Sequence, residues 1–447
     1  MPFSAYFDTP TNYPNKFNFY NVGSSPLLLE KLLDILNNED DTIEEVKLGL
    51  YLFNNKALNK RLVELANCGV KVDVVTIPIE GYDTTNPKEI INIQTNEIEN
   101  SGSKYDFAKT IFETHYRKEI PNYTLYFFPH IYLRSENVKA FSRGEMPYSL
   151  HLKSFLIKYK NKIGTIGLSS SNFAVRDLAK EENLLIVENE ADYFNPAYSF
   201  FNTLLENALP IYDFDFKKDY TNYAIKTTEQ PLSNKTNFIA PFYFDAAFKA
   251  EEIMLDLISS AVTSIKIVAQ HICPVSYNFN GNFHSGFENK TIYKEGLLNK
   301  LIEKANSGIK VEFISQTFAS SENNPDIKFR VPVNKTAFIE FYNAIKNIPN
   351  ISYAVNENIH SKYIIIDEKV FVSSFNYTPT QFIYLDKVDI KTFKNNPGKS
   401  YKGIHCETGQ YCIIDNEEIA KAYKNNFTNL LAKKETVLVK KLYLQST

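Results

Sequence analysis

The sequence predicts an α/β protein made of two similar halves, each a mixed β-sheet flanked by helices, with one active site shared between them. Three observations support this prediction: a helix-strand segment occurs twice, a His-x-Lys motif follows each copy, and the chain has 447 residues. Domains typically contain about 100–200 residues, so this length suits two units better than one core. With one His-Lys set per half, both halves are needed to complete one site.

The repeated segment comprises residues 58–72 in the first half and 297–311 in the second, which align without a gap. Both copies contain the pattern Leu-x3-Leu-x-Glu-x-Ala-Asn-x-Gly-x-Lys. Leucines at this spacing lie on one face of a helix, and Asn-x-Gly is typical of a helix end because Gly adopts the left-handed conformation easily. β-rich runs predict strands on either side of the two helices, at residues 46–53, 70–77, 264–269 and 309–314.

A His-x-Lys motif opens a β-rich hairpin in each half, with His151 and Lys153 in the first and His360 and Lys362 in the second. Because side chains alternate along a strand, the His and the Lys of each motif point to the same side. A Ser-x-Asn segment on the next strand can add neutral donors, namely Ser170 and Asn172, and Ser374 and Asn376. Such a set suits phosphate, since the Lys supplies charge, hydroxyl and amide groups donate hydrogen bonds, and the His can attack phosphorus or donate a proton.

These motifs resemble the signature of the phospholipase D superfamily, His-x-Lys-x4-Asp followed by a small-residue turn and Ser-x-Asn, which occurs once per half-site. The second motif matches it from His360 to Asn376, with Asp367 as the acidic residue. The first motif has Lys158 at the position of the Asp, and in this it is similar to the tyrosyl-DNA phosphodiesterase branch. The resemblance implies a duplicated phospholipase D-like fold.

The resemblance also implies the chemistry. One histidine attacks phosphorus to form a covalent phosphohistidine, while the other protonates the leaving oxygen and then activates the water or alcohol that releases the product. The first-half histidine is usually the nucleophile, so we expect His151 to attack and His360 to act as acid and base. Charge on the phosphoryl oxygens would be stabilised by Lys153, Lys362, Asn172 and Asn376. No metal and no cofactor are expected.

Each histidine needs a partner that orients its second ring nitrogen. Glu182 opens a strand after the first motif, where the family often has an acidic residue, and we expect Glu407 to be its counterpart after an insertion at about 386–403. The alternative is that both are exposed acids at the ends of elements. Asp367 is expected to support the motif rather than carry a proton, because strand alternation points it away from the His and Lys.

The boundary between the halves is expected where the apolar periodicity breaks. We place the first half at residues 1–212, a linker at 213–236 and the second half at 237–447. No apolar run approaches the ~20 residues that span a bilayer, and the N-terminus has neither a basic nor a hydrophobic segment, so we expect a soluble cytoplasmic protein. The four cysteines have no C-x-x-C spacing and are expected to be reduced thiols. The duplication permits a functional monomer.

The formal net charge of −3 means that any binding to nucleic acid must come from a local patch. The candidate patch surrounds the first motif and follows an aromatic-rich run at residues 123–132, on which bases could stack. Its basic residues are Lys139, Arg143, Lys153, Lys158, Lys160 and Lys162. The alternative interpretation places the aromatic residues in the core and the lysines on a solvated hairpin tip.

The leading functional prediction is a metal-independent phosphodiesterase that acts on nucleic acid, most simply a nuclease. One alternative is a phospholipid phosphodiesterase or phosphatidyl transferase, although the sequence contains no basic amphipathic helix that could anchor it to a lipid surface. The other is a catalytically degenerate module retained for binding, which the Lys158 departure slightly favours. The type of strand and the sequence preference lie beyond these observations.

Overall fold

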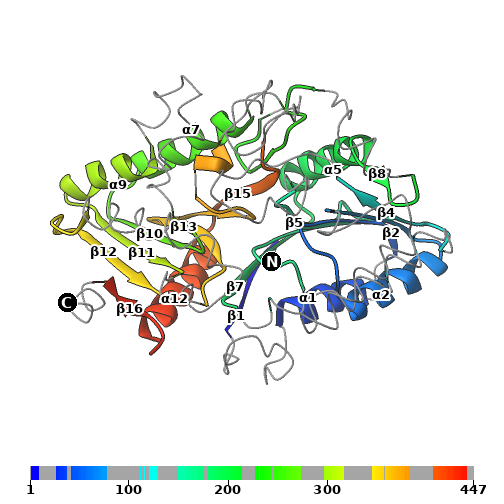
Figure 1. Cartoon of the computed structure of the whole chain (residues 1–447), viewed down its shortest axis with the longest axis horizontal. Helices are drawn as coiled ribbons and strands as arrows, with labels where there is room; N and C mark the ends of the chain where they lie inside the picture. The colour runs from blue at the N-terminus through cyan, green and yellow to red at the C-terminus, as the bar shows by residue number, and fades with distance from the viewer. Residues whose placement is uncertain are drawn as a thin grey trace, which may run out of the picture.

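The fold is described from a computed structural model of the chain. The residues described are 2–9, 27–37, 42–77, 111, 115, 120–128, 150–174, 177, 180–213, 227–230, 232–243, 246–272, 296–316, 345–356, 358–377, 379–382 and 406–439. Figure 1 shows two β-sheets, one from each half, with helices covering them. The predicted α/β fold with two mixed sheets is therefore confirmed.

The first sheet contains β1 (Phe3–Asp8), β2 (Ile43–Leu50), β3 (Lys71–Thr76), β4 (Tyr123–Phe127), β5 (Lys153–Tyr159), β6 (Thr165–Ser169), β7 (Glu182–Glu188) and β8 (Leu209–Pro210). Their order in space is β1-β7-β6-β5-β2-β3-β4-β8. Strands β2, β3 and β4 run parallel, and the other neighbouring pairs are antiparallel. This combination makes the sheet mixed.

The second sheet contains β9 (Thr236–Ile239), β10 (Ser264–Ala269), β11 (Lys310–Ser315), β12 (Ile351–Val355), β13 (Lys362–Ile366), β14 (Lys369–Ser373), β15 (Gly409–Asp415) and β16 (Val437–Leu438). Read from β9, the order is β9-β15-β14-β13-β10-β11-β12-β16. Each position matches the first sheet, with β9 in the place of β1 and β13 in the place of β5. The duplication therefore extends over both sheets.

Six helices occupy equivalent places in the two halves. Their bounds are α1 (Leu27–Leu36), α2 (Lys56–Asn67), α5 (Ala191–Glu206), α7 (Ala246–Ser259), α9 (Leu297–Asn306) and α12 (Glu417–Ala432), and a short 3₁₀-helix η6 spans Pro379–Phe382. Helices α1 and α2 pack on one face of the first sheet, and α7 and α9 on one face of the second. Helices α5 and α12 contribute to a core that both halves share.

The repeated helix-strand segment folds as the sequence predicts. Helix α2 begins where the side chain of Asn55 accepts a hydrogen bond from Leu58 N at 3.0 Å. Both copies end at a glycine in the left-handed region, with φ of +89° at Gly69 and +97° at Gly308. A side chain there would strain the backbone, which explains why the Asn-x-Gly pattern occurs in both copies.

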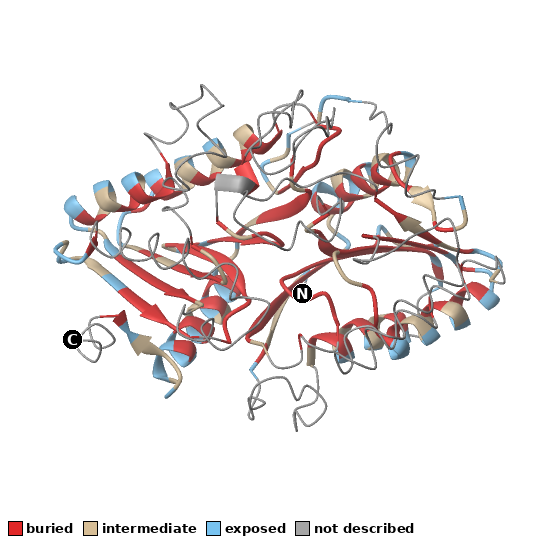
Figure 2. Cartoon of the chain, viewed as in Figure 1, coloured by how far each residue is buried: buried red, intermediate tan, exposed pale blue. Residues whose placement is uncertain are grey.

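The shared core joins the halves through aromatic side chains. The rings of Phe200 on α5 and Phe238 on β9 stack with centroids 3.9 Å apart. The hydroxyl of Tyr193 donates to Ile413 O at 2.9 Å, also across the halves. Figure 2 shows that buried residues line the strands of both sheets. The halves are therefore packed together over a hydrophobic surface, as a shared active site requires.

The expected linker at 213–236 is only partly visible, because residues 214–226 and 231 lie outside the described part. The boundary between the halves therefore stays a prediction. Over the ranges given above, no helix has both the length and the apolar character needed to cross a membrane.

Candidate active site

Both His-x-Lys motifs lie at the same edge of their sheets. Lys153 begins β5 and pairs in register with Leu50, the last residue of β2. Lys362 begins β13 and pairs with Ala269, the last residue of β10. The motifs therefore meet the carboxyl ends of the parallel strands, the edge at which α/β sheets usually bind ligands.

Each histidine is held by a carboxylate from the other half of the chain. His360 Nδ1 lies 2.6 Å from Glu182 Oε1, and His151 Nδ1 lies 3.1 Å from Glu407 Oε1. In such a pair the carboxylate favours the tautomer with its proton on Nδ1, which leaves Nε2 for chemistry. The structure thus brings the four predicted residues together as two crossed pairs.

Backbone hydrogen bonds repeat this crossing. His151 N donates to Thr408 O at 2.8 Å, and His360 N donates to Glu181 O at 3.0 Å. Lys362 N donates to the side-chain oxygen of Asn183 at 2.8 Å. These bonds fix the start of each motif strand against the other half, so both histidines depend on the packing of the halves.

The two lysines are buried, with 1% exposure for Lys153 and 0% for Lys362. Lys153 Nζ donates to His151 O at 3.1 Å and to Ser374 O in the other half at 3.5 Å, and Lys362 Nζ donates to His360 O at 2.6 Å. Burial, and then the charge of Lys362, lower the pKa of Lys153 well below its usual range, although nearby acids oppose this shift. The two ammonium groups therefore act on each other within one site.

The two asparagines occupy matching positions. The side-chain oxygen of Asn172 accepts from Leu52 N, and that of Asn376 accepts from His271 N, each at 3.3 Å. Asn172 Nδ2 also donates to Asp177 Oδ2 at 3.2 Å, and Asp177 is a residue that we did not predict. Asp177 lies five residues beyond Asn172 in a 3₁₀ turn, where its N donates to Ala174 O at 3.0 Å, and no sequence motif marks it.

The two serines, which we expected to support the site and to offer donors, are engaged by protein groups. Ser170 Oγ donates to Glu182 and accepts from Asn183 N at 2.8 Å. Ser374 Oγ accepts from Gln410 N at 3.0 Å. Both hydroxyls are fully buried and tie the Ser-x-Asn turn to the strand beside it. They support the site rather than line it.

The same contacts show that Glu407 is not the positional counterpart of Glu182. Ser170 N donates to Asn183 O, and Ser374 N donates to Gln410 O, so the residue equivalent to Glu182 is Gly409. A Cβ atom on Gly409 would lie 2.5 Å from Phe375 Cδ1. The ring of Phe375 leaves no room for an acid at this position, and the carboxylate comes from two residues earlier in the chain.

Asp367 holds the turn after β13 rather than the reacting groups. It has a positive φ of 52° and accepts hydrogen bonds from Val262 N, Thr263 N and Ser264 N at 2.7–2.9 Å. Partial burial opposes ionisation, but these bonds and the Thr263 hydroxyl lower the pKa of Asp367 to about 2. Lys158, at the matching place in the first half, forms an exposed ion pair with Glu44 at 2.9 Å.

A further acid that the sequence did not reveal lies beside Glu182. Asp8 at the end of β1 pairs in register with Glu182 at the start of β7, and both are buried. Burial and then the charge of Glu182 raise the pKa of Asp8 to about 7. Burial also raises the pKa of Glu182 to about 7, against the opposing charge of Lys362 and the hydrogen bond from Ser170. Only strand pairing brings these two acids together.

Of the predicted basic segment, Lys153 belongs to the site itself, and the other described lysines lie along or beyond β5. Lys139 and Arg143 lie outside the described part of the chain. Lys160 and Lys162 lie in the turn after β5, at the opposite end of that strand from Lys153. Lys162 Nζ lies 4.1 Å from the ring centroid of Tyr159 on the same hairpin. The interpretation as a solvated hairpin tip fits these contacts.

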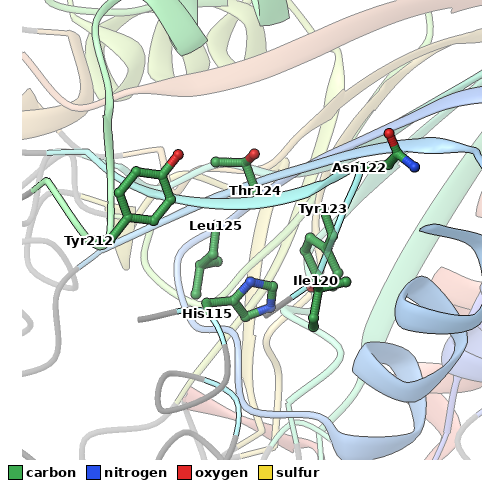
Figure 3. Close-up of a pocket in the computed structure, with 7 residues that line it drawn as sticks. All are labelled: His115, Ile120, Asn122, Tyr123, Thr124, Leu125 and Tyr212. Carbon is green, nitrogen blue, oxygen red and sulfur yellow. The ribbon is translucent and has the colours of Figure 1, made fainter. Parts of the chain in front are cut away.

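A small cavity of about 120 Å³ lies along β4, and its lining includes neither His151 nor His360 (Figure 3). It is lined by His115, Ile120, Asn122, Tyr123, Thr124, Leu125 and Tyr212. Burial lowers the pKa of His115 to about 4, so this imidazole is neutral at pH 7. The ring of His115 packs on Tyr123 with centroids 4.1 Å apart, and we assign it no role in the site.

Comparison with solved structures identifies the fold. Phosphatidylserine synthase from Haemophilus influenzae aligns over 93% of this chain and 86% of its own, with a TM-score of 0.50 and 12% identity. Polyphosphate kinase from Porphyromonas gingivalis aligns over 97% of this chain and 48% of its own, with a TM-score of 0.47 and 12% identity. This chain therefore spans about half of the length of that enzyme. Nuc from Salmonella typhimurium, a phospholipase D family member, aligns over 43% of this chain and 91% of its own, with a TM-score of 0.25 and 16% identity.

No protein-family model matches the sequence, and no curated protein does. The 12% identity with phosphatidylserine synthase limits what this comparison establishes to the fold. The chain has a duplicated phospholipase D-like fold. The predicted resemblance to that superfamily is confirmed at this level.

Proposed function

We propose that the protein is a phosphodiesterase that acts through a covalent phosphohistidine, with nucleic acid as the leading substrate. The observation that carries this proposal is the pair of crossed histidine–carboxylate contacts, His151 with Glu407 and His360 with Glu182, around two buried lysines. A nucleophile, an acid and positive charge are the three groups that displacement at phosphorus needs.

The two pairs differ in ways that favour different roles. The side chains of His151 and Glu407 are 16% and 13% exposed, whereas those of His360 and Glu182 are 8% and 0% exposed. The more accessible His151 suits attack on an incoming phosphate. The shorter, more buried contact of His360 suits storage of a proton for the leaving group, because the carboxylate stabilises the imidazolium.

The proposed reaction has two displacements. His151 Nε2 attacks phosphorus, a P–N bond forms, and the P–O bond to the leaving group breaks as His360 gives that oxygen its proton. Water then attacks phosphorus, His360 takes a proton from it, and the P–N bond breaks to free His151. Through both steps Lys153 and Lys362 balance the charge on the non-bridging oxygens, which also favours the ammonium form of Lys153.

The choice of substrate rests on the expected character of the protein and on how each substrate would be bound. A phosphodiester with a nucleoside on each side fits the soluble character predicted from the sequence, and nothing in the described residues favours a lipid over it. A nucleic acid would be bound through its phosphates, so its affinity should fall steeply as salt increases. A phospholipid would instead contact apolar surface and depend little on salt.

The test is turnover in EDTA on labelled single- and double-stranded DNA, RNA and phosphatidylcholine vesicles. Wild type is compared with His360→Ala, and His115→Ala serves as a control that removes a buried imidazole far from the site. Nucleic-acid cleavage that is lost only in His360→Ala supports the proposal. Cleavage of lipid alone supports a phospholipid phosphodiesterase or transferase, and no turnover on any substrate supports a degenerate binding module.

A further inference from the structure

The two halves differ at the edge of the site, where β2 and β10 end. Leu50 pairs with Lys153 as Ala269 pairs with Lys362, so these two residues are equivalent. The next residue is Tyr51 in the first half and Gln270 in the second. An aromatic ring therefore stands beside one half-site where an amide stands beside the other.

Tyr51 contacts both reactive groups of the first motif. Its ring meets the imidazole of His151 edge-on, with centroids 5.8 Å apart and planes at 88°. Lys153 Nζ lies 5.7 Å from the centroid of the same ring. Tyr51 N donates to Leu152 O at 3.0 Å, which fixes the backbone, and the side chain is partly exposed. The ring is therefore held in place at the border of the site and reaches solvent.

The matching border in the second half is polar. Gln270 Nε2 donates to the side-chain oxygen of Gln316, which follows β11, at 3.3 Å. The equivalent of Gln316 in the first half is Ile77, because β3 and β11 correspond residue by residue. Both glutamines are partly exposed. The second half thus presents amide groups where the first half presents only the ring of Tyr51, because Ile77 is buried in the core.

We propose that Tyr51 binds the face of a nucleobase in the part of the substrate that stays attached to phosphorus, so that the first half selects the retained nucleoside. The inference rests on the proposed function. After the P–O bond breaks, phosphorus is bonded to His151, which the Tyr51 ring touches, whereas the leaving group departs beside His360. A base stacks on a tyrosine ring through its π-face, which every nucleobase has, so the selection is for a base and not for a sequence.

Two phosphodiesters that share a leaving group test this directly: p-nitrophenyl thymidylate, which retains a nucleoside, and methyl p-nitrophenyl phosphate, which retains a methyl group. The measured quantity is the ratio of kcat/KM for the thymidine ester to that for the methyl ester. Tyr51→Ala should lower this ratio by about 5- to 150-fold, the range for one stacked base. Tyr51→Phe should keep the wild-type ratio, because the π-face remains.

Gln270→Ala is the matched control at the equivalent position, and it should leave the ratio at its wild-type value. If Tyr51→Ala lowers kcat/KM equally for both esters, the ring only positions His151 and the inference is overturned. A ratio that falls in Gln270→Ala and not in Tyr51→Ala would overturn it too, by placing the retained group in the second half. Absence of wild-type turnover on both esters would instead refute the proposed function, and the inference with it.

Discussion

The imidazole of His360 lies 2.6 Å from the carboxylate of Glu182, although the two residues are 178 positions apart and belong to different halves. Glu182 also accepts from the hydroxyl of Ser170, its neighbour in the same half. One carboxylate therefore couples the Ser-x-Asn turn of the first half to the histidine of the second. A change in the packing of either half should therefore alter the position of the Glu182 carboxylate.

Glu182→Gln should lower kcat by about 10²–10⁴, because an amide cannot stabilise the imidazolium that protonates the leaving group. The pH profile of kcat should change as well, since the proton of His360 would no longer be shared with a carboxylate. Glu181→Gln is the control: it removes an ion pair with Lys433 and leaves the hydrogen bond between His360 and Glu182 in place. An unchanged pH profile in Glu182→Gln would contradict the proposed acid role.

Asp8→Asn should change how stability depends on pH. Burial raises the pKa of Asp8 to about 7, far above the ordinary range of an aspartate, so between pH about 4 and 7 the folded protein keeps a proton that the unfolded chain has lost. The contribution of Asp8 to stability therefore falls as pH rises through this window, by at most about 1.4 kcal/mol per pH unit for one proton. Urea unfolding across the window should show a shallower decline in Asp8→Asn.

The control for Asp8 is Asp34→Asn, which alters an exposed acid on α1 that pairs with Lys31 at 3.2 Å. This variant should keep the wild-type pH dependence of unfolding. An equal change in both variants would mean that the buried position of Asp8 is not the cause.

Asp367→Ala should destabilise the protein by about 1–3 kcal/mol, because the backbone amides of Val262, Thr263 and Ser264 lose a charged acceptor. The stabilisation is present above the ordinary aspartate pKa of about 4 and is lost as pH falls through about 2. Lys158→Ala at the matching position should cost at most about 1 kcal/mol, as expected for an exposed ion pair. Thermal unfolding of the two variants at neutral pH compares them, and equal losses would refute the supporting role of Asp367.

Gly409→Ala should destabilise by about 1–3 kcal/mol, because the added Cβ would overlap the ring of Phe375. Phe375→Leu should relieve part of this cost, so the double variant should be more stable than the sum of the two single effects. A double-mutant cycle from urea unfolding measures the coupling, and additive losses would show that the ring does not exclude a side chain at this position.

Much of this architecture could be predicted because it depends on residue patterns within short segments of the sequence. The leucine spacing and Asn-x-Gly end of residues 58–72 and 297–311 gave both helices and the strand after each one. The two His-x-Lys motifs predicted the hairpins that carry the site and the histidines and lysines that meet there. Each of these features depends on residues close together in the sequence.

The parts that escaped prediction depend on pairing between distant segments. Asp8 reaches Glu182 only because β1 and β7 are neighbours, and nothing near Asp8 in the sequence indicates this. The residue equivalent to Glu182 is Gly409, and the sequence does not reveal this equivalence. A side chain at position 409 is excluded by the ring of Phe375, which follows a different strand. Each histidine contacts a carboxylate of the other half because of the way in which the two sheets pack. The spacing of apolar residues along the sequence does not determine that packing.

The presence of Gly409 at the position equivalent to Glu182 also has a consequence for how the two halves are joined. If two identical half-length chains assembled as a symmetric dimer, every residue would be present in both half-sites, and a glycine at the place of Glu182 would remove both orienting acids together. Once the two copies are joined in one polypeptide, each half-site can change alone. Glu182 and Glu407 reach their histidines from non-equivalent positions, an arrangement that a single chain permits and a symmetric dimer of identical chains does not.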